Sequence, residues 1–175
     1  MTNLGIEPIR SDHDTQFFGC GVKSLDRWLE KEALPAHKGG LSRTWVSFDP
    51  DDEYRNVMGF VTLCPAAVTE KVRGSSGSRA NGYPSFELCK LARHLDVGRS
   101  GHGEELIGFA LLLTARAAHM VGGRFLVVDP HVRDLDDVSA EELREFYRRY
   151  GFEDAEESNK MYVTIATIND WLDQP

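Results

Sequence analysis

The chain has 175 residues, of which 41% are hydrophobic and 27% are charged, and its formal net charge is −8. This length suits one globular domain with a sizeable core, and we expect residues 1–175 to form it. No apolar run approaches the roughly 18 residues of a membrane span, and the first residues lack the order of a secretory signal. We therefore expect a cytoplasmic protein without a membrane partner. The negative charge argues against indiscriminate nucleic-acid binding, because phosphates need clustered Lys and Arg.

Three cysteines, Cys20, Cys64 and Cys89, are widely spaced and form neither a C-x-x-C pair nor a zinc-binding pattern with histidines. We therefore predict reduced, mostly buried thiols, no disulfide framework and no metal site. None of them has the local pattern of a catalytic nucleophile. A thiol enzyme stays an alternative, because His and Asp are plentiful in the chain.

The first half of the chain predicts strands around one helix. Residues 6–10 fit a short strand, and residues 24–34 have apolar side chains at helical spacing, with Ser24 as the N-cap and Pro35 ending the helix. Residues 43–48 and 57–68 are rich in β-branched and aromatic side chains and predict an antiparallel pair, in which Pro65 bends or ends the second strand. The polar, Gly- and Ser-rich stretch at residues 70–84 predicts a flexible excursion.

The second half alternates strands with helices. Residues 85–92 predict a strand, and the helix after it should run to about Val121, before Gly122 and Gly123. The next strand, within residues 124–129, is nearly all apolar, which is typical of a strand buried on both faces.

The end of the chain predicts one more helix and one more strand. Ser139 and Glu142 form a capping box that opens a helix through Tyr150, which Gly151 stops. Residues 161–168 predict the last strand. This order of elements predicts a mixed α/β sheet with helices on both faces.

A glycine cradle, residues 98–103 in the sequence GRSGHG, lies between the predicted strand and the long helix. The first N–H groups of a helix have no internal partner and the helix dipole adds positive charge, so a phosphate or pyrophosphate binds well there. The spacing is neither that of a Walker loop nor that of a Rossmann fingerprint. Glycines that only ease a tight corner are the structural alternative. Glu104 and Glu105 suit a first helical turn but lower its positive potential.

The stretch KLARHLDVGRSGHGEELI resembles the cofactor-binding signature of the GNAT N-acetyltransferases, a strand followed by Q/R-x-x-G-x-G/A and a helix. On this match Gly101 and Gly103 fill the two glycine positions. Gly98 stands where the family has Gln or Arg, which removes a side-chain donor to the pyrophosphate. The resemblance implies acetyl-CoA as cosubstrate and no metal. The residues implied to bind it are Leu91, Ala92, Arg93, Gly98, Arg99, Ser100, Gly101, His102, Gly103 and Glu104.

A second motif, FYRRYGF at residues 146–152, resembles the F-Y-x-x-x-G-F of the same family. The resemblance implies that Tyr147 is the general acid, and a phenol of reference pKa near ~10 stays protonated until a thiolate forms. The alternative is an aromatic residue packed in the core. Glu87 is our first candidate for a general base, if one is needed, and the others are His94, Asp129 and His131.

The N-terminal stretch FFGCGVKSLDRWLEKEALPAHKGGLSRTWV resembles the branch that contains the acetyltransferase toxins of toxin–antitoxin pairs. This resemblance implies a GNAT fold with a mixed, mostly antiparallel central sheet. It also implies an aminoacyl-tRNA as acceptor of the acetyl group and an antitoxin protein as partner, and it leaves open a homodimer. Four arginines near these motifs either meet tRNA phosphates or form a solvated face: Arg93, Arg144, Arg148 and Arg149.

Two other functions remain open. The acidic chain also suits an acetyltransferase for a small, polyamine-like amine or a protein amine, because an acidic cleft attracts cations. The departure at Gly98 and the acidic pair at the helix start suit a non-catalytic module that keeps the fold and binds CoA.

Overall fold

The computed structural model describes residues 4–70, 82–98, 100–130 and 140–173. The chain divides into two compact units, each built from two separate stretches of sequence. The first unit comprises Met1–Cys64 and Cys89–Gly108, and the second comprises Pro65–Leu88 and Phe109–Pro175. A single domain over residues 1–175 stays a prediction. Residues 71–81 of the predicted excursion at residues 70–84 lie outside the described residues. Tyr83 and Pro84 belong to β4, which begins two residues before the predicted strand.

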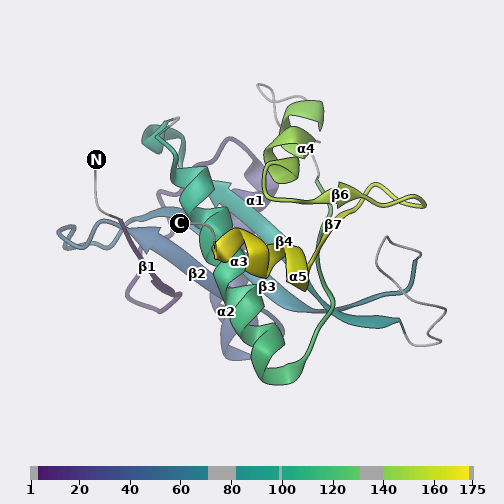
Figure 1. Cartoon of the computed structure of the whole chain (residues 1–175). Coiled ribbons are helices and arrows are strands. Elements are labelled where there is room, and N and C mark those ends of the chain that lie inside the picture. The colour runs from purple at the N-terminus through teal and green to yellow at the C-terminus, as the bar shows by residue number, and fades with distance from the viewer. Residues whose placement is uncertain (1–3, 71–81, 99, 131–139, 174–175) are drawn as a thin grey trace. The chain divides into compact units, whose positions relative to one another are not determined.

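Seven strands form a mixed sheet in the order β1-β2-β3-β4-β5-β7-β6 (Figure 1). The pairing of β4 with β5 is parallel, whereas β1 with β2, β2 with β3, β5 with β7 and β6 with β7 are antiparallel. The predicted mixed, mostly antiparallel sheet is therefore confirmed. The strands are β1 (Gly5–Pro8), β2 (Arg43–Phe48), β3 (Val57–Val68), β4 (Tyr83–Arg93), β5 (Phe125–Val128), β6 (Glu153–Asp154) and β7 (Met161–Thr164).

The helices fall between these strands except α5, which follows β7, and α3 is the longest of the described helices, with 20 residues. Its end at Val121 is the predicted one, because Gly122 follows with a φ of +83° and donates its N–H to the Ala118 carbonyl. The helices are α1 (Lys23–Trp28), η1 (Leu29–Ala33, a π-helix), α2 (Leu34–Lys38), η2 (Leu95–Val97, a 3₁₀ turn), α3 (His102–Val121), α4 (Ala140–Arg148) and α5 (Ile165–Leu172).

The N-terminal helical segment differs from the prediction at both ends. It begins at Lys23, with Val22 at the N-cap and no side-chain cap, so Ser24 does not cap it. It also continues past Pro35, which lies in the first turn of α2. The π-helix η1 comes directly before, and a π-helix carbonyl bonds to the N–H five residues on. This shift of partner lets the helix continue through a residue that has no N–H.

The predicted antiparallel pair of residues 43–48 and 57–68 is confirmed as β2 and β3. β3 does not end at Pro65, because the ladder with β2 ends at Leu63 and the missing proline N–H breaks no bond of that ladder. The prediction for the last strand was wrong. The predicted strand over residues 161–168 is a strand only to Thr164. The Thr164 hydroxyl accepts the Thr167 N–H at 3.0 Å, which caps α5 and turns the rest of the segment into a helix.

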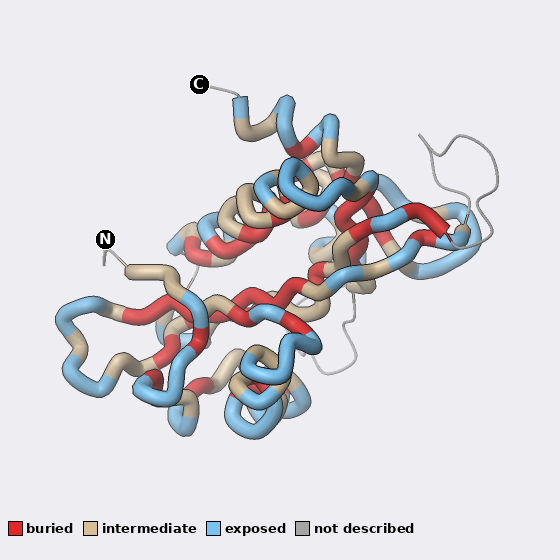
Figure 2. The backbone as a smooth tube through the Cα atoms, turned by 90° about the horizontal axis from the view of Figure 1, so that it is seen from below, coloured by how far each residue is buried: buried red, intermediate tan, exposed pale blue. Residues whose placement is uncertain are grey.

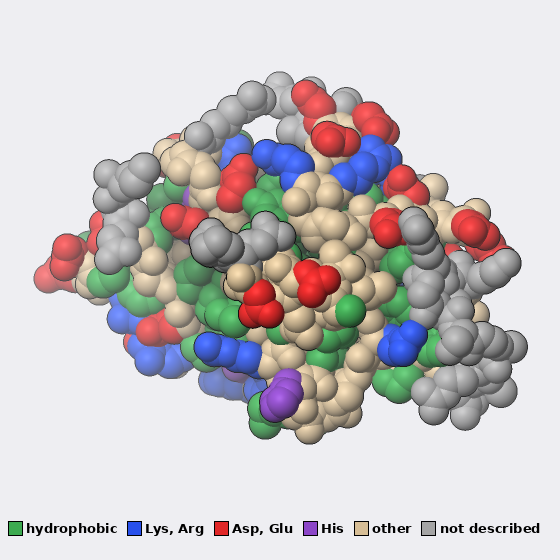
Figure 3. Space-filling model, in the orientation of Figure 1, with side chains coloured by type: hydrophobic (Ala, Val, Ile, Leu, Met, Phe, Trp, Pro, Cys, Tyr) green, Lys and Arg blue, Asp and Glu red, His purple; other side chains and the backbone are tan. Residues whose placement is uncertain are grey.

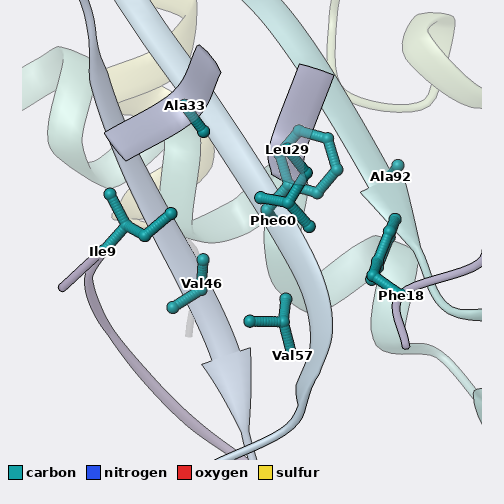
Figure 4. Packing of buried hydrophobic residues seen from close by; sticks show 8 residues of the cluster. All are labelled: Ile9, Phe18, Leu29, Ala33, Val46, Val57, Phe60 and Ala92. Atoms are coloured by element: carbon teal, nitrogen blue, oxygen red, sulfur yellow. The ribbon is translucent and has the colours of Figure 1, made fainter. Parts of the chain in front are cut away.

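The core of the first unit lies between the helices α1 to α2 and one face of β2 and β3 (Figure 4). Phe60 is fully buried at its centre, with its ring 5.4 Å from Phe18 and 5.8 Å from Trp28. Successive side chains of a strand point to opposite faces. The neighbours of Val46 and Phe60, Ser47 and Gly59, therefore face the first turns of α3. In this unit, helices cover both faces of the sheet, as predicted.

The second unit has its own core around β5. All residues of β5 are buried, as the apolar sequence predicted, and Phe125 packs edge-to-face against Tyr83 and Tyr162. Figure 2 shows the buried residues in red along the backbone, with the exposed residues in pale blue. α4 begins at Ala140, next to the predicted capping box, but Ser139 lies outside the described residues, and the helix ends two residues before Tyr150. None of the described helices is long and apolar enough to cross a membrane.

We predict that Phe60→Ala destabilises the protein by about 3–5 kcal/mol, because the fully buried ring leaves a cavity between the sheet and α1. Urea denaturation of the wild type and the variant measures the change. Phe17→Ala is the matched control, since the Phe17 side chain is 75% exposed and its loss should change stability by no more than about 0.5 kcal/mol. Equal losses in both variants would contradict the assigned core.

Candidate functional site

The end of β4 and the turn after it are held by backbone and side-chain hydrogen bonds. β4 ends at Arg93, with Ala92 buried in the core and Leu91 partly buried. The His94 N–H then donates to the Met58 carbonyl at 2.7 Å. The His94 ring accepts the Asp96 N–H at 3.1 Å and starts the turn η2. This turn delivers the chain to the glycine cradle.

Two glycines of the cradle have backbone conformations that other residues rarely adopt. The φ angles are +59° at Gly98 and +86° at Gly101. A Cβ atom at either position would meet no heavy atom within 4 Å. The backbone angle therefore requires glycine here, and the side where a Cβ would stand is open to a ligand. Ser100 is exposed, and Arg99 lies outside the described residues.

The first turn of α3 has the features of an anion site. The Gly101 carbonyl accepts the Glu105 N–H at 3.1 Å, so Gly101 is the N-cap and brings no side chain to cover the helix end. The N–H groups at the start of a helix have no acceptor within it. Those of His102 and Gly103 are thus placed to bind an anion, beside the acidic side chains of Glu104 and Glu105.

The His102 side chain does not face the open side of the cradle. Its ring is 2% exposed, with Nε2 2.7 Å from the Ser47 hydroxyl and Nδ1 3.0 Å from a Glu105 carboxylate oxygen. What His102 can offer a cofactor is therefore its backbone N–H. The sequence analysis missed Ser47 and Gly59. A glycine inside a strand is the signal that could have found them, because it marks a close approach of another group.

Tyr147 lies in the last turn of α4 and is 5% exposed. Its ring lies 5.3 Å from Phe146 and 5.4 Å from Phe152, measured between centroids. Burial raises the pKa of the phenol well above its ordinary value, so the hydroxyl stays protonated throughout the physiological range.

The candidate bases lie in different places. Glu87 is partly buried in β4, where it is paired with Val127 of β5 in the second unit. His94 belongs to the first unit, and its Nε2 lies 3.1 Å from the Phe17 carbonyl oxygen. Asp129 is partly buried just after β5, and His131 lies outside the described residues. No base is assigned by these contacts, and Glu87 stays a prediction.

Two of the four arginines considered for tRNA contacts form ion pairs within the second unit. The Arg144 Nε donates to Asp154 at 2.9 Å, and Arg148 donates to the other oxygen of Asp154 at 2.9 Å. Arg148 also pairs with Glu141 and Glu145. Figure 3 shows Lys and Arg side chains in blue among Asp and Glu side chains in red over α4. These arginines therefore fit the solvated face better than a phosphate site.

The three cysteines are partly buried, whereas the prediction was that they are mostly buried. Burial is the main reason that the pKa of Cys20 rises to about 12, so its thiol is a poor nucleophile at neutral pH. The Sγ atoms of Cys64 and Cys89 lie 2.8 Å apart, which the sequence spacing did not predict. Among the described residues, no group of three or more His, Cys, Asp or Glu side chains lies together as metal ligands do.

A hollow of about 540 Å³ lies beside the end of β4, in the first unit. Exposed rings of Phe17 and Tyr54 line it together with the carboxylates of Asp14 and Asp96. Two carboxylates repel a phosphate group. The glycine cradle, with its backbone N–H groups, is therefore the better place for a diphosphate.

No protein-family model matches the chain. Among solved structures, it is similar to AtaTR bound with acetyl-CoA, at 25% identity over 98% of this chain and 99% of that chain, with a TM-score of 0.79. It is also similar to a tyrosine-to-phenylalanine variant of KacT, at 25% identity over 96% and 98% of the two chains, with a TM-score of 0.80. AtaT complexed with acetyl-methionyl-tRNAfMet matches at 24% identity over 97% and 99%, with a TM-score of 0.82. These neighbours are GNAT-fold acetyltransferase toxins of toxin–antitoxin pairs.

The chain has the GNAT fold.

The GNAT fold agrees with the two motifs on which the resemblance was based. The cradle lies between β4 and α3, and Tyr147 lies at the end of α4, in the predicted order. The fold does not by itself give these residues their roles. The roles of Tyr147, Glu87 and the cradle residues stay predictions.

The ion pairs of Asp154 predict how stability changes with pH. Arg148 and then Arg144 hold the pKa of Asp154 below its ordinary value in the folded state. The stabilisation is therefore present above the unfolded pKa and is lost as the pH falls through the lower, folded pKa. We predict that Asp154→Asn lowers stability at pH 7 and makes the loss of stability below about pH 4 shallower.

Thermal unfolding between pH 7 and pH 2 measures this change. Asp51→Asn, in the exposed loop before β3, is the control and should follow the wild type. An acid transition of Asp154→Asn as steep as that of the wild type would show that the two arginines do not stabilise the carboxylate.

Proposed function

We propose that the protein is an acetyl-CoA-dependent N-acetyltransferase that acetylates the α-amino group of an aminoacyl-tRNA, as the toxin of a toxin–antitoxin pair. The observation that carries the proposal is the open glycine cradle at the start of α3 on a GNAT fold. The structures of AtaT with acetyl-CoA and with acetyl-methionyl-tRNAfMet support the cosubstrate and the acceptor. Both reactants are cytoplasmic molecules, so we place the reaction there.

The cradle would bind the diphosphate of acetyl-CoA through backbone N–H groups. The positive φ angles of Gly98 and Gly101 shape the loop, and α3 adds the positive end of its dipole. Because Gly98 brings no side-chain donor, binding would depend on the backbone more than in relatives with Gln or Arg. The backbone of Leu91, Ala92 and Arg93 would hold the pantetheine arm and the thioester.

In the chemical step, the amine nitrogen bonds to the thioester carbonyl carbon, the carbon–sulfur bond breaks and CoA leaves as a thiolate. Tyr147 would give this thiolate its proton. A CoA thiol has a pKa near that of Cys, about 8.5, so transfer from a buried phenol of raised pKa is uphill by itself. We infer that the proton released by the amine returns to the phenolate in the same step, directly or through water.

The acceptor needs little help to become a nucleophile. A free α-amino group has a reference pKa of about 7.7–8.0, so a substantial fraction is neutral near pH 7. Glu87 would act as a base only if proton removal limits the rate. Its replacement should then lower the rate.

A small cationic amine is the second candidate acceptor. The net charge of −8 favours a cation over a polyanionic RNA. Arg144 and Arg148 already pair with Asp154, and Arg148 also pairs with Glu141 and Glu145. An antitoxin partner belongs to the first candidate only, as with the AtaT toxin solved with the C-terminus of the antitoxin AtaR. A homodimer stays a prediction in either case.

We predict that Tyr147→Phe lowers kcat about 10²-fold or more with little change in the KM for acetyl-CoA, because it removes the proton donor and leaves the ring. The assay follows labelled acetyl groups into charged tRNA and, in parallel, into a panel of polyamines. Tyr150→Phe is the matched control, since it removes a hydroxyl from a second buried tyrosine after α4.

Label that enters charged tRNA only with active protein supports the proposal. Label that enters polyamines instead moves the function to the second candidate. An unchanged kcat in Tyr147→Phe would remove this tyrosine from the mechanism, and no transfer to any amine would favour a CoA-binding module.

We predict that Gly101→Ala weakens acetyl-CoA binding about tenfold or more, because the loop must leave the φ of +86° and its N–H groups turn away from the diphosphate. Isothermal titration calorimetry measures the dissociation constant. Gly122→Ala is a close control at the other end of the same helix, where φ is +83° and the space is equally open. Similar affinity in both variants would rule out the cradle as the diphosphate site.

A further inference from the structure

A buried hydrogen-bonded chain links β2 to the first turn of α3. The Ser47 hydroxyl lies 2.7 Å from Nε2 of His102, and Nδ1 of His102 lies 3.0 Å from the Glu105 carboxylate. Ser47 is fully buried and His102 is 2% exposed, whereas the Glu105 side chain is 65% exposed. These three hydrogen-bonded side chains therefore connect the start of α3 to β2 at the Ser47 end and reach solvent at the Glu105 end.

These three residue types in this order also form the nucleophile, base and acid of serine hydrolases. A hydrolytic function does not fit here, because Ser47 is fully buried and a substrate could not reach its oxygen. The hydrogen bonds instead satisfy polar groups that would be costly to leave unpaired in the interior. We therefore look for their role in the element that they hold in place, which is the first turn of α3.

Gly59, which has no side chain, leaves the space that Ser47 and His102 occupy. It is paired with Ser47 across β2 and β3, and its φ is not in the left-handed region. A Cβ at Gly59 would lie 2.7 Å from Nε2 of His102 and 2.9 Å from both the Ser47 hydroxyl oxygen and Leu106 Cδ1. Steric space, and not backbone angle, therefore requires glycine here, because the His102 ring lies directly against the strand.

The cradle itself has little packing to keep it in place. A Cβ at Gly98 or Gly101 would meet nothing within 4 Å, and Gly101 brings no side-chain cap to the helix. Within the cradle, the His102 ring is buried against the sheet. The bond between His102 and Ser47 therefore helps to hold the N–H groups of His102 and Gly103, together with the fully buried Leu106 and Ile107 one turn further along α3.

We propose that Ser47 and His102 are positioning residues for the CoA diphosphate, acting through the first turn of α3. This inference rests on the proposed function, since it assumes that the cradle binds CoA. We call the hydrogen bond between Ser47 and His102 the tether. Loss of the tether would leave the fold in place but let the start of α3 move. Binding of the diphosphate would then weaken, because it depends on preorganised N–H groups. The affinity for any ligand with the same diphosphate should fall, while the rate at saturation should change little.

The test compares Ser47→Ala with Thr44→Val in the full-length protein. Thr44 is on the same strand, and its hydroxyl is 3.0 Å from that of Thr62 in another fully buried pair, so both variants break one buried hydrogen bond. Calorimetry gives the dissociation constants of CoA and of ADP, which carries the diphosphate without the pantetheine arm. We expect Ser47→Ala to weaken both about tenfold and Thr44→Val to weaken neither, with kcat at saturating acetyl-CoA close to that of the wild type in both.

Other outcomes overturn the inference in distinguishable ways. If the wild type binds CoA and Ser47→Ala binds it equally well, the tether is only structural and the proposed function stands. If Ser47→Ala weakens CoA but not ADP, the tether acts on the pantetheine arm and not on the diphosphate. If the wild type binds neither ligand, the proposed function falls and this inference falls with it.

Gly59→Ala is the second variant, for the case that Ser47→Ala does not fold. Its added methyl group pushes on the His102 ring while Ser47 keeps its hydroxyl. We expect the same parallel loss of CoA and ADP affinity in the folded protein, verified by circular dichroism. Wild-type affinity for both ligands in folded Gly59→Ala would also overturn the inference.

Discussion

The start of α3 has to be open on one side and fixed on the other. Its N–H groups can bind an anion only if nothing in the protein covers them, and a glycine N-cap meets that need. A helix end without a capping side chain is poorly held by its own loop, and the hydrogen bond between His102 and Ser47 supplies an anchor at its first residue. The proposed acetyl transfer depends on this combination, because the diphosphate is the group by which the cradle would position acetyl-CoA.

Local patterns predicted much of the fold. β2, β3 and β5 and the end of α3 follow from apolar periodicity and glycine positions, which act within a few residues. The errors at Pro35 and at residues 165–168 have local causes that periodicity does not contain, a π-helix in one case and a threonine cap in the other. The glycine cradle was found from its sequence. The tether was not, because Ser47 and His102 are 55 residues apart and meet only through tertiary packing.

The observations favour different molecules as the acceptor of the acetyl group. The N-terminal motif and the neighbour AtaT favour an aminoacyl-tRNA. The acidic composition and the internal pairing of Arg144 and Arg148 remove two of the positive charges that RNA phosphates would need. The proposed chemistry is the same for either acceptor, since both present a primary amine to the thioester. The cofactor half of the site can therefore be tested without knowing the acceptor.

The most direct test is a two-dimensional ¹⁵N–¹H NMR titration of the wild type with CoA. The account predicts that the backbone amide signals of Gly101, His102 and Gly103 shift first and most, because a diphosphate accepting their hydrogen bonds changes the field at each N–H. Adding pantetheine, which has no diphosphate, should leave these signals in place. CoA binding that shifts other amides while these three stay unchanged would contradict the claim that the start of α3 holds the cofactor.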